Sequence, residues 1–299
     1  MVEYLEVVGW WEYLEVVNLK LPSLIQSNFF EWQKTKFPSG FYFCMLQILI
    51  YMVGTAGSGK TYLTKALADW FDYKNLENVI VNLDPGAENL PYNPEIDVRD
   101  YFTLEDVMLN YGVGPNGAQI IAADLISTKI EEIKDEIEYY DTPYVLIDTP
   151  GQMELFTLRE SSNLLVDTLG KERSVMVYLF DPVVAKTPSG FLSLLFMCSS
   201  AVFKLNIPQI PVLAKADVLN EQEVERILSW SMEPENIYES ICQAMEKNIS
   251  SELFYLLRDL GLFRPLVPVS ALDNFGIEDI YDGVQELFYG GEDLEKVLF

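Results

Sequence analysis

One glycine-rich segment, GTAGSGKT at residues 54–61, constrains the fold of this chain more than any other feature. It matches the pattern G-x-x-x-x-G-K-[ST], and it lies between an apolar β-branched run and a stretch with helical spacing of apolar residues. Glycines at these positions let the backbone wrap around a phosphate with its N–H groups pointing inward. Lys60 adds a positive charge, and Thr61 adds a hydroxyl for Mg²⁺. The segment therefore predicts a nucleotide phosphate loop, and a glycine-rich connection with an incidental lysine is the weaker interpretation.

The chain from residue 45 onward alternates short apolar runs with helical periodicity, which is typical of βα units. Each run is almost continuously apolar, as expected for strands that helices cover on both faces. The sequence therefore predicts an α/β fold for residues 45–299, a three-layer P-loop NTPase fold with a mostly parallel sheet. The expected strands are 48–53, 79–83, 144–147, 175–180, 210–213 and 266–269. Functional side chains are expected at the carboxyl ends of these strands.

Residues 1–44 form a separate N-terminal extension in this interpretation. The hexapeptide EYLEVV occurs at residues 3–8 and again, unchanged, at 12–17, and an aromatic-rich stretch follows at 29–43. Two explanations stay open: a family-specific extension that packs its aromatic residues on the domain, or an over-extended reading frame whose natural start is Met45. The second is favoured.

Charge and composition exclude several classes of function. The chain has 20 basic and 46 acidic residues, a net charge of −26, so its field repels nucleic acid and anionic lipid. Neither partner is expected, and a bound anion needs local backbone amides. The chain has no histidine, which removes Ser/His/Asp and Cys/His nucleophiles. Three cysteines without paired spacing indicate a reduced, cytoplasmic protein.

The apolar segment at residues 191–203 is too short for a membrane span, so no membrane partner is expected. Two interpretations of it stay open. It could be a helix that faces a partner subunit or a hydrophobic client, or it could be a core helix over the sheet, and the second is favoured.

Polar residues that follow two other strands predict the catalytic edge of the site. Asp148 ends one strand and could bind Mg²⁺ through water, while Gly151, in the D-x-x-G pattern, could donate its N–H to a γ-phosphate. Gln152 falls where a glutamine can orient the attacking water, although a solvated side chain is the alternative. Asp84, after another strand, could also orient a water, directly or through Mg²⁺. Taken alone, Asp84 would be a capping or turn aspartate.

A third group of residues predicts guanine recognition. The segment Ala214 to Asp217 resembles N-K-x-D, in which the carboxylate accepts the ring N–H and the exocyclic amine of guanine and the lysine stem lies along the base. Ala214 cannot make the amide contacts of the usual asparagine, which weakens base selection. Ser270 and Ala271 resemble a loop whose backbone supports the base, with a small-residue turn as the alternative.

These motifs together resemble the GPN-loop GTPase family, and most of all its small archaeal members. The resemblance covers most of the chain beyond residue 44. It rests on the phosphate loop, on NLDP at 82–85, on IDVR at 96–99, on the Gly-Pro-Asn of GVGPNG at 112–117, and on DTPGQME at 148–154.

The resemblance implies a homodimer in which Gly114, Pro115 and Asn116 of one subunit reach toward the nucleotide of the other. It also implies that Asn116 acts near the γ-phosphate as an arginine finger does elsewhere, and that Asp84 and Gln152 act on the attacking water. Lys60, Asp84, Asn116 and Gln152 are then the expected catalytic residues, and Thr61 and Asp148 the Mg²⁺ ligands. The residues expected to contact GTP are Gly57, Ser58, Gly59, Lys60, Thr61, Tyr62, Gly114, Pro115, Asn116, Gly151, Lys215, Asp217, Ser270 and Ala271.

The expected function is GTP binding and hydrolysis by a homodimer that acts as a nucleotide-dependent switch or assembly factor, with a protein client. Two alternatives stay open. The first is an ATP-dependent P-loop kinase, which Ala214 supports because it weakens the selection of guanine. The second is a slowly hydrolysing, chaperone-like binding module, which is compatible with a switch.

Overall fold

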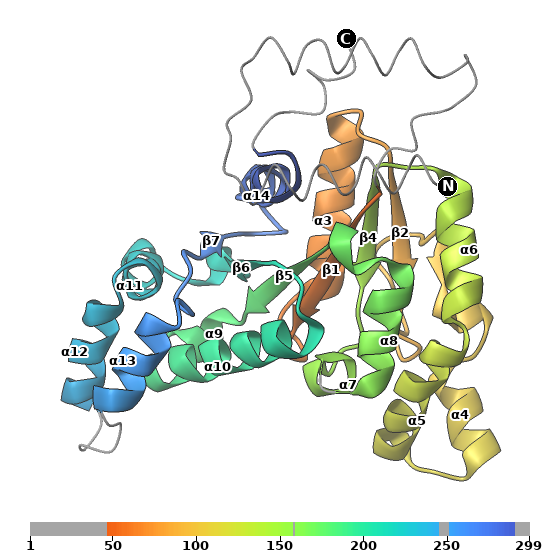
Figure 1. The fold of residues 1–299 in the computed structure, drawn as a ribbon, viewed down its shortest axis with the longest axis horizontal. Coiled ribbons are helices and arrows are strands. Elements are labelled where there is room, and N and C mark those ends of the chain that lie inside the picture. The colour runs from red at the N-terminus through yellow and green to blue at the C-terminus, as the bar shows by residue number, and fades with distance from the viewer. Residues whose placement is uncertain (1–46, 158, 245–250, 291–299) are drawn as a thin grey trace, which may run out of the picture. The chain divides into compact units, whose positions relative to one another are not determined.

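A single seven-stranded sheet organises the part of the chain that the computed structural model describes, residues 47–157, 159–244 and 251–290. All strand pairs are parallel, and the order is β3-β2-β4-β1-β5-β6-β7 (Figure 1). The strands are β1 (Ile48–Gly54), β2 (Asn78–Asn82), β3 (Ile96–Asp97), β4 (Tyr144–Asp148), β5 (Ser174–Phe180), β6 (Gln209–Leu213) and β7 (Val267–Pro268). The predicted α/β class is confirmed. The predicted extension at residues 1–44 lies outside the described residues.

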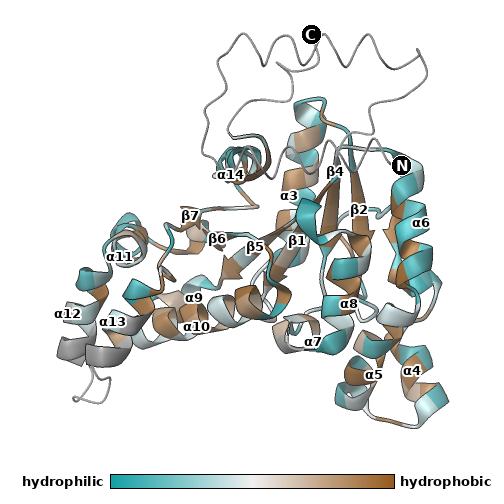
Figure 2. Cartoon of the chain, in the orientation of Figure 1, coloured by the Kyte–Doolittle hydropathy of each residue, from teal (hydrophilic) through white to brown (hydrophobic). Residues whose placement is uncertain are grey.

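Both faces of the sheet are covered by helices, as the continuous apolar runs predict. Residues of β1 alternate between two core clusters: Leu49, Tyr51 and Val53 lie in one, and Ile48 and Ile50 lie in the other. Figure 2 shows apolar strands flanked by helices of mixed polarity. The three-layer prediction is therefore confirmed.

The helices divide between these faces. The face of Ile48 is covered by α3 (Lys60–Tyr73) and α14 (Ile277–Tyr289). The face of Leu49 packs against a larger set: α5 (Pro115–Thr128), α6 (Ile130–Tyr140), α7 (Met153–Thr157), α8 (Glu160–Leu169), α9 (Pro182–Ala185), α10 (Pro188–Leu205), α11 (Glu221–Met232), α12 (Pro234–Ala244) and α13 (Ser251–Asp259). A further helix, α4 (Leu104–Tyr111), packs on α5 through Val107, Ala118 and Ala122. Three 3-10 turns complete the described elements: η1 (Val98–Asp100), η2 (Lys171–Arg173) and η3 (Ala216–Val218).

Helix α10 contains the apolar segment that the sequence leaves between two interpretations. Among the described residues it is the one helix long and apolar enough to cross a membrane. Phe191 and Leu194 are buried in the core cluster on the Leu49 face, which confirms the core-helix interpretation for that side. Phe196 and Phe203, in contrast, are 41% and 68% exposed.

The parallel register brings the predicted motifs to one edge of the sheet. Asp148 at the end of β4 lies beside Met52 of β1 and Asn82 of β2, and Asn82 lies beside Asp97 of β3. The segments that follow these strands therefore meet at the same edge, where the sequence places the site.

Candidate nucleotide-binding site

The loop at residues 54–61 has the backbone that a phosphate cradle needs. Gly57 and Gly59 have φ of 76° and 104°, in the left-handed region that a residue with a Cβ rarely adopts. Helix α3 starts at Lys60, and Gly59 caps it without a side-chain acceptor. The first N–H groups of α3 therefore have no capping side chain, and the N-terminus of a helix favours an anion.

Lys60 connects this loop to the segment after β4. Its side chain is buried, and Nζ donates to the carbonyl oxygens of Gly54 at 3.0 Å, Thr55 at 3.2 Å and Gly151 at 3.0 Å. The phosphate loop and the segment that the sequence assigns to the γ-phosphate are thus joined through one ammonium group. A charge held at this point suits a nucleotide phosphate in a chain of net charge −26.

Asp148 has the features of a residue that binds Mg²⁺. Its side chain is buried, Oδ2 accepts from the hydroxyl of Tyr92 at 2.7 Å, and Oδ1 has no hydrogen-bond partner in the described part of the chain. Burial raises the pKa of Asp148 to about 6, against the opposing effects of the Tyr92 hydroxyl, the Thr61 hydroxyl and the Lys60 ammonium. A buried carboxylate oxygen without a partner beside a threonine hydroxyl fits a magnesium ion.

The described residues contain no group of three acidic, cysteine or histidine side chains that could hold a metal ion. Magnesium usually keeps several waters and binds one or two protein ligands together with the substrate phosphates. Thr61 and Asp148 therefore suffice for the protein's share of such a site.

Replacement of Asp148 by asparagine is expected to stabilise the nucleotide-free protein at pH 7.5, by about 2–3 kcal/mol in the free energy of unfolding. The folded state raises the pKa of Asp148 from 3.8 to about 6, so it favours the neutral carboxyl. That stability is complete below the unfolded pKa and is lost as the pH rises through about 6. Asparagine keeps the shape without the charge. Urea unfolding at pH 7.5 measures the gain.

The same measurement at pH 5 is expected to give about half the gain, because part of the wild-type Asp148 is then protonated. Asp279→Asn, an equal change of charge at an exposed position of α14, is the control and is expected to have little effect at either pH. Equal unfolding midpoints for Asp148→Asn and the wild type at pH 7.5 would contradict the prediction.

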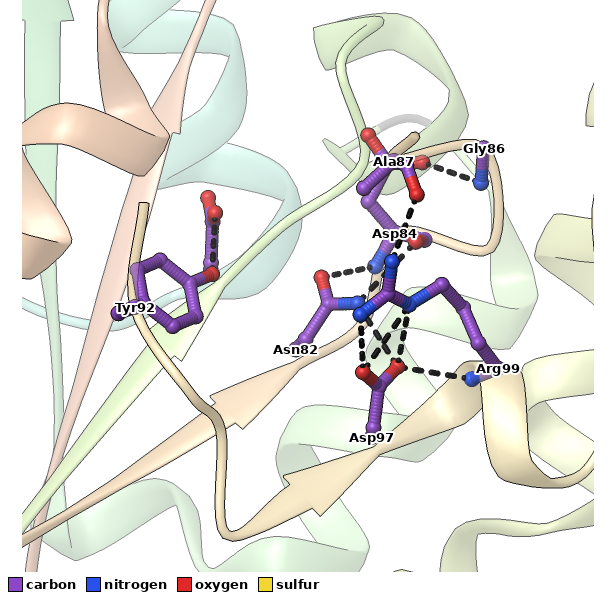
Figure 3. Close-up of polar contacts among 8 residues, drawn as sticks. Asn82, Asp84, Gly86, Ala87, Tyr92, Asp97 and Arg99 are labelled. Carbon is purple, nitrogen blue, oxygen red and sulfur yellow. Dashed lines mark hydrogen bonds and ion pairs between the residues drawn. The ribbon is translucent and has the colours of Figure 1, made fainter. Parts of the chain in front are cut away.

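Asp84 lies at the same edge, in the turn after β2 (Figure 3). Its Oδ1 accepts the N–H of Gly86 at 2.9 Å, as expected for a turn aspartate. Its Oδ2 accepts the N–H of Gly151 at 3.1 Å, the same donor that the sequence assigns to the γ-phosphate. Burial raises the pKa of Asp84, against the effects of these two N–H groups and of Lys60. The turn and the functional interpretations of Asp84 are thus compatible.

Four residues of this edge were given no role at the site from the sequence: Tyr92, and Asn82, Asp97 and Arg99, which lie in segments that carry the family resemblance. Asn82 and Asp97 bond each other at 2.9 Å, Arg99 pairs with Asp97, and Tyr92 bonds Asp148. The sequence analysis did not predict strand β3, which is only two residues long. This strand places Asp97 beside Asn82. Without that strand, only the family resemblance, which includes residues 96–99, connects residues 97–99 with the site.

Three of the residues predicted to hold the base, Lys215, Asp217 and Ala271, line one cavity of about 380 Å³. Lys215 has a left-handed backbone with φ of 50°, and its Nζ donates to the carbonyl oxygen of Gly57 at 2.5 Å. Its stem lies against Gly59, where an added Cβ would come within 3.1 Å of Lys215 Cε. Lys215 therefore closes the phosphate loop on the side of the cavity. The predicted residues that line the cavity are Ser58, Gly59, Tyr62, Lys215, Asp217 and Ala271.

Ser270 lies behind this cavity and does not line it. Its side chain is buried, and Oγ accepts the N–H of Asp273 at 3.1 Å. Ser270 thus stabilises the turn that places Ala271 at the cavity. The loop is therefore a small-residue turn, and its position also allows it to support the base.

Besides the phosphate-loop, sheet-edge and Ser270 residues described above, four predicted residues do not line this cavity. Gly114, Pro115 and Asn116 form the exposed start of α5, with Gly114 as the N-cap and Pro115 as the first helical residue. None of them lines the cavity. Gln152 is exposed just before α7 and does not line it either. Their predicted roles stay predictions.

Comparison with known proteins gives a consistent result. Residues 52–290 match the family described as "Conserved hypothetical ATP binding protein". The chain is 31% identical over 257 residues to GPN-loop GTPase 3 of Dictyostelium discoideum, with 82% of this chain and 88% of that protein covered. It is 29% identical over 260 residues to GPN-loop GTPase 1 of the same organism, with 84% and 65% covered, so it spans just under two thirds of that longer relative.

A solved structure agrees. The crystal structure of PAB0955, described as a GTPase in apo form from Pyrococcus abyssi, aligns with a TM-score of 0.70 at 31% identity. The alignment covers 82% of this chain and 99% of that one. Together with the phosphate loop, the Asp84 turn and the Gly-Pro-Asn segment on α5, these matches show that the chain belongs to the GPN-loop GTPase family.

Proposed function

We infer that this protein binds GTP with Mg²⁺ and hydrolyses it to GDP and phosphate. The observation that carries this function is that Gly151 contacts both Lys60 and Asp84, so the phosphate loop, the D-x-x-G segment and a carboxylate meet at one point. The names of the relatives support the substrate and the reaction. Binding of a fluorescent GDP, competed by GTP and by ATP, tests the base, and phosphate release tests the reaction.

The contacts suggest how the residues would act. GTP bound in the phosphate loop accepts hydrogen bonds from its N–H groups, and Lys60 turns from its carbonyl partners to the phosphates. The N–H of Gly151 then donates its hydrogen bond to the γ-phosphate instead of to Asp84. The Asp84 carboxylate, released from this bond, accepts a proton of the attacking water. The water oxygen bonds to the γ-phosphorus as the bond to the β–γ bridging oxygen breaks. Magnesium held near Thr61 and Asp148 would neutralise the charge on the phosphate oxygens.

Base selection would depend on Asp217 and Lys215. A carboxylate at position 217 can accept from both N–H donors of guanine, whereas adenine offers no such pair. The buried Ala214 provides no amide to support this contact. Together with the family description as ATP-binding, Ala214 favours one second candidate, an ATP-dependent P-loop kinase. Displacement of fluorescent GDP by ATP as effective as by GDP would support that candidate.

A homodimer would complete the site. Asn116 is exposed at the start of α5, away from the cavity of its own chain. Leu109 of α4 and Ile120 of α5, on the same helix pair, are 82% and 46% exposed. An apolar surface beside an exposed amide suits contact with a second copy, in which Asn116 would reach the γ-phosphate region of the partner.

Complementation between two inactive variants tests this arrangement. Asn116→Ala is expected to lower GTP turnover about 10²-fold by removal of one donor. Lys60→Ala inactivates the phosphate loop but keeps Asn116. In a 1:1 mixture half of the dimers combine both variants and have one complete site of two, so turnover is expected to recover to about a quarter of the wild-type value. No recovery in the mixture would contradict a role for Asn116 across the interface.

The cellular role that fits this protein is that of a regulatory GTPase. A nucleotide-dependent switch or assembly factor in the cytoplasm, with a protein client, agrees with the acidic surface and with the buried free thiol of Cys198. Phe203 on α10, 68% exposed, is an apolar side chain available to such a client. A client captured in the GTP state and released in the GDP state would support the switch.

A further inference from the structure

The Arg99 guanidinium joins two segments on either side of the catalytic turn. Its Nε and Nη2 donate to the carboxylate of Asp97 at 3.0 Å and 2.6 Å, which fixes the plane of the group. Its Nη1 donates to the carbonyl oxygen of Ala87 at 2.8 Å, three residues after Asp84. One planar group therefore ties the end of β3 to the loop that contains Asp84.

A second connection runs from Asp97 to Asp84 through a buried amide. Asn82 is fully buried, and its Nδ2 donates to Asp97 Oδ1 at 2.9 Å. The Oδ1 of Asn82 accepts the backbone N–H of Asp84 at 3.0 Å, and its Nδ2 also donates to the carbonyl oxygen of Asp84 at 3.3 Å. Both backbone polar groups of Asp84 thus bond the side chain that Asp97 orients (Figure 3).

The same turn is attached to the helix that precedes the Gly-Pro-Asn segment. The N–H of Leu104, the first residue of α4, donates to the carbonyl oxygen of Pro85 at 3.0 Å. A reciprocal capping box between Thr103 and Asp106 fixes this end of α4. The other end of α4 leads through Gly112 to α5, which α4 packs against. A displacement of this helix pair by a partner would therefore act on the turn of Asp84.

These contacts range from the fully buried Asn82 to the Asp97–Arg99 pair, whose side chains are 12% and 27% exposed. Their shared feature is that every path ends on residues 84–87. We propose that Asp97 and Arg99 are positioning residues that hold the Asp84 carboxylate in register for the attacking water. This inference rests on the proposed role of Asp84 in hydrolysis.

A double-mutant cycle on the full chain tests the proposal. Arg99→Gln is expected to lower kcat for GTP about tenfold, because a small misplacement of a catalytic group is costly, while KM and the affinity for fluorescent GDP stay within about twofold. Asp84→Asn is expected to lower kcat about 100-fold. In the Asp84→Asn background, Arg99→Gln is expected to cause no further loss, since Arg99 acts through Asp84.

Two further variants complete the test. Arg99→Lys keeps the positive charge but removes the planar guanidinium with its paired N–H donors, so it is expected to lower kcat about as much as Arg99→Gln. It replaces Arg99→Gln in the test if that variant does not fold. Arg258→Gln breaks a more exposed ion pair, between Arg258 of α13 and Glu235 of α12, and is expected to leave kcat and KM unchanged. An additive loss in the double variant, or a loss confined to KM, would overturn the positioning role alone. Full activity of Asp84→Asn would instead overturn the proposed role of Asp84 itself.

Discussion

Replacement of Lys60 by alanine is expected to lower GTP turnover by about 10²- to 10³-fold, the range for loss of one preorganised donor at the reacting charge. The effect is large because Lys60 is buried at the point where Gly54 and Gly151 meet, and the chain around it carries a net charge of −26. Phosphate release under saturating GTP measures turnover, and fluorescent GDP binding measures the loss of affinity.

Lys74→Ala is the matched control, because Lys74 follows α3 directly and pairs at the surface with Glu278. It is expected to change turnover by less than about twofold. Thermal unfolding of both variants separates a loss of function from a loss of fold. Wild-type turnover in Lys60→Ala would show that the phosphate loop does not take part in the reaction.

Most of the sheet could be predicted because apolar runs and phosphate chemistry both leave local signals. The predicted runs at 48–53 and 175–180 differ from β1 and β5 by one residue at one end. Two strands were harder. The run at 266–269 contributes only the two residues of β7, and β3 was not predicted because two residues among prolines and charges have no periodicity. Both are edge strands, where few neighbours impose a pattern.

The site residues also fall into those that a local sequence pattern indicates and those that it does not. The phosphate loop begins where the buried strand β1 ends, and Asp148 is the last residue of the buried strand β4, so a local pattern places both at the sheet edge. Tyr92 and Arg99 act through hydrogen bonds that span 56 and 12 residues of sequence, to Asp148 and Ala87. Such contacts depend on the path of a connection with no regular structure, which a single sequence does not specify. The sequence suggests the reacting groups but not the side chains that orient them.

The second large effect is expected from Asp217, the residue proposed to select guanine over adenine. Asp217 lines the cavity beside Lys215 and Ala271, and a carboxylate there would accept two N–H donors of guanine. Net contributions of about 1.5–3 kcal/mol for each hydrogen bond to a charged group amount to a factor of about 10²–10⁴ in affinity. Ala214 removes the amide support of the neighbouring position, so Asp217 would provide most of the discrimination between guanine and adenine.

Asp217→Asn is therefore expected to weaken GTP binding by about 10²- to 10⁴-fold and to leave ATP binding almost unchanged. Xanthine has a carbonyl where guanine has its exocyclic amine, so the amide that this substitution introduces can donate to that oxygen while its own oxygen accepts the ring N–H. Xanthosine triphosphate is then expected to restore binding and turnover in the variant but to bind the wild type poorly. Asp279→Asn, with the same change of charge on α14, should preserve the wild-type preference. Equal affinity of the wild type and Asp217→Asn for GTP would mean that other residues select the base, and it would favour the alternative, an ATP-dependent kinase.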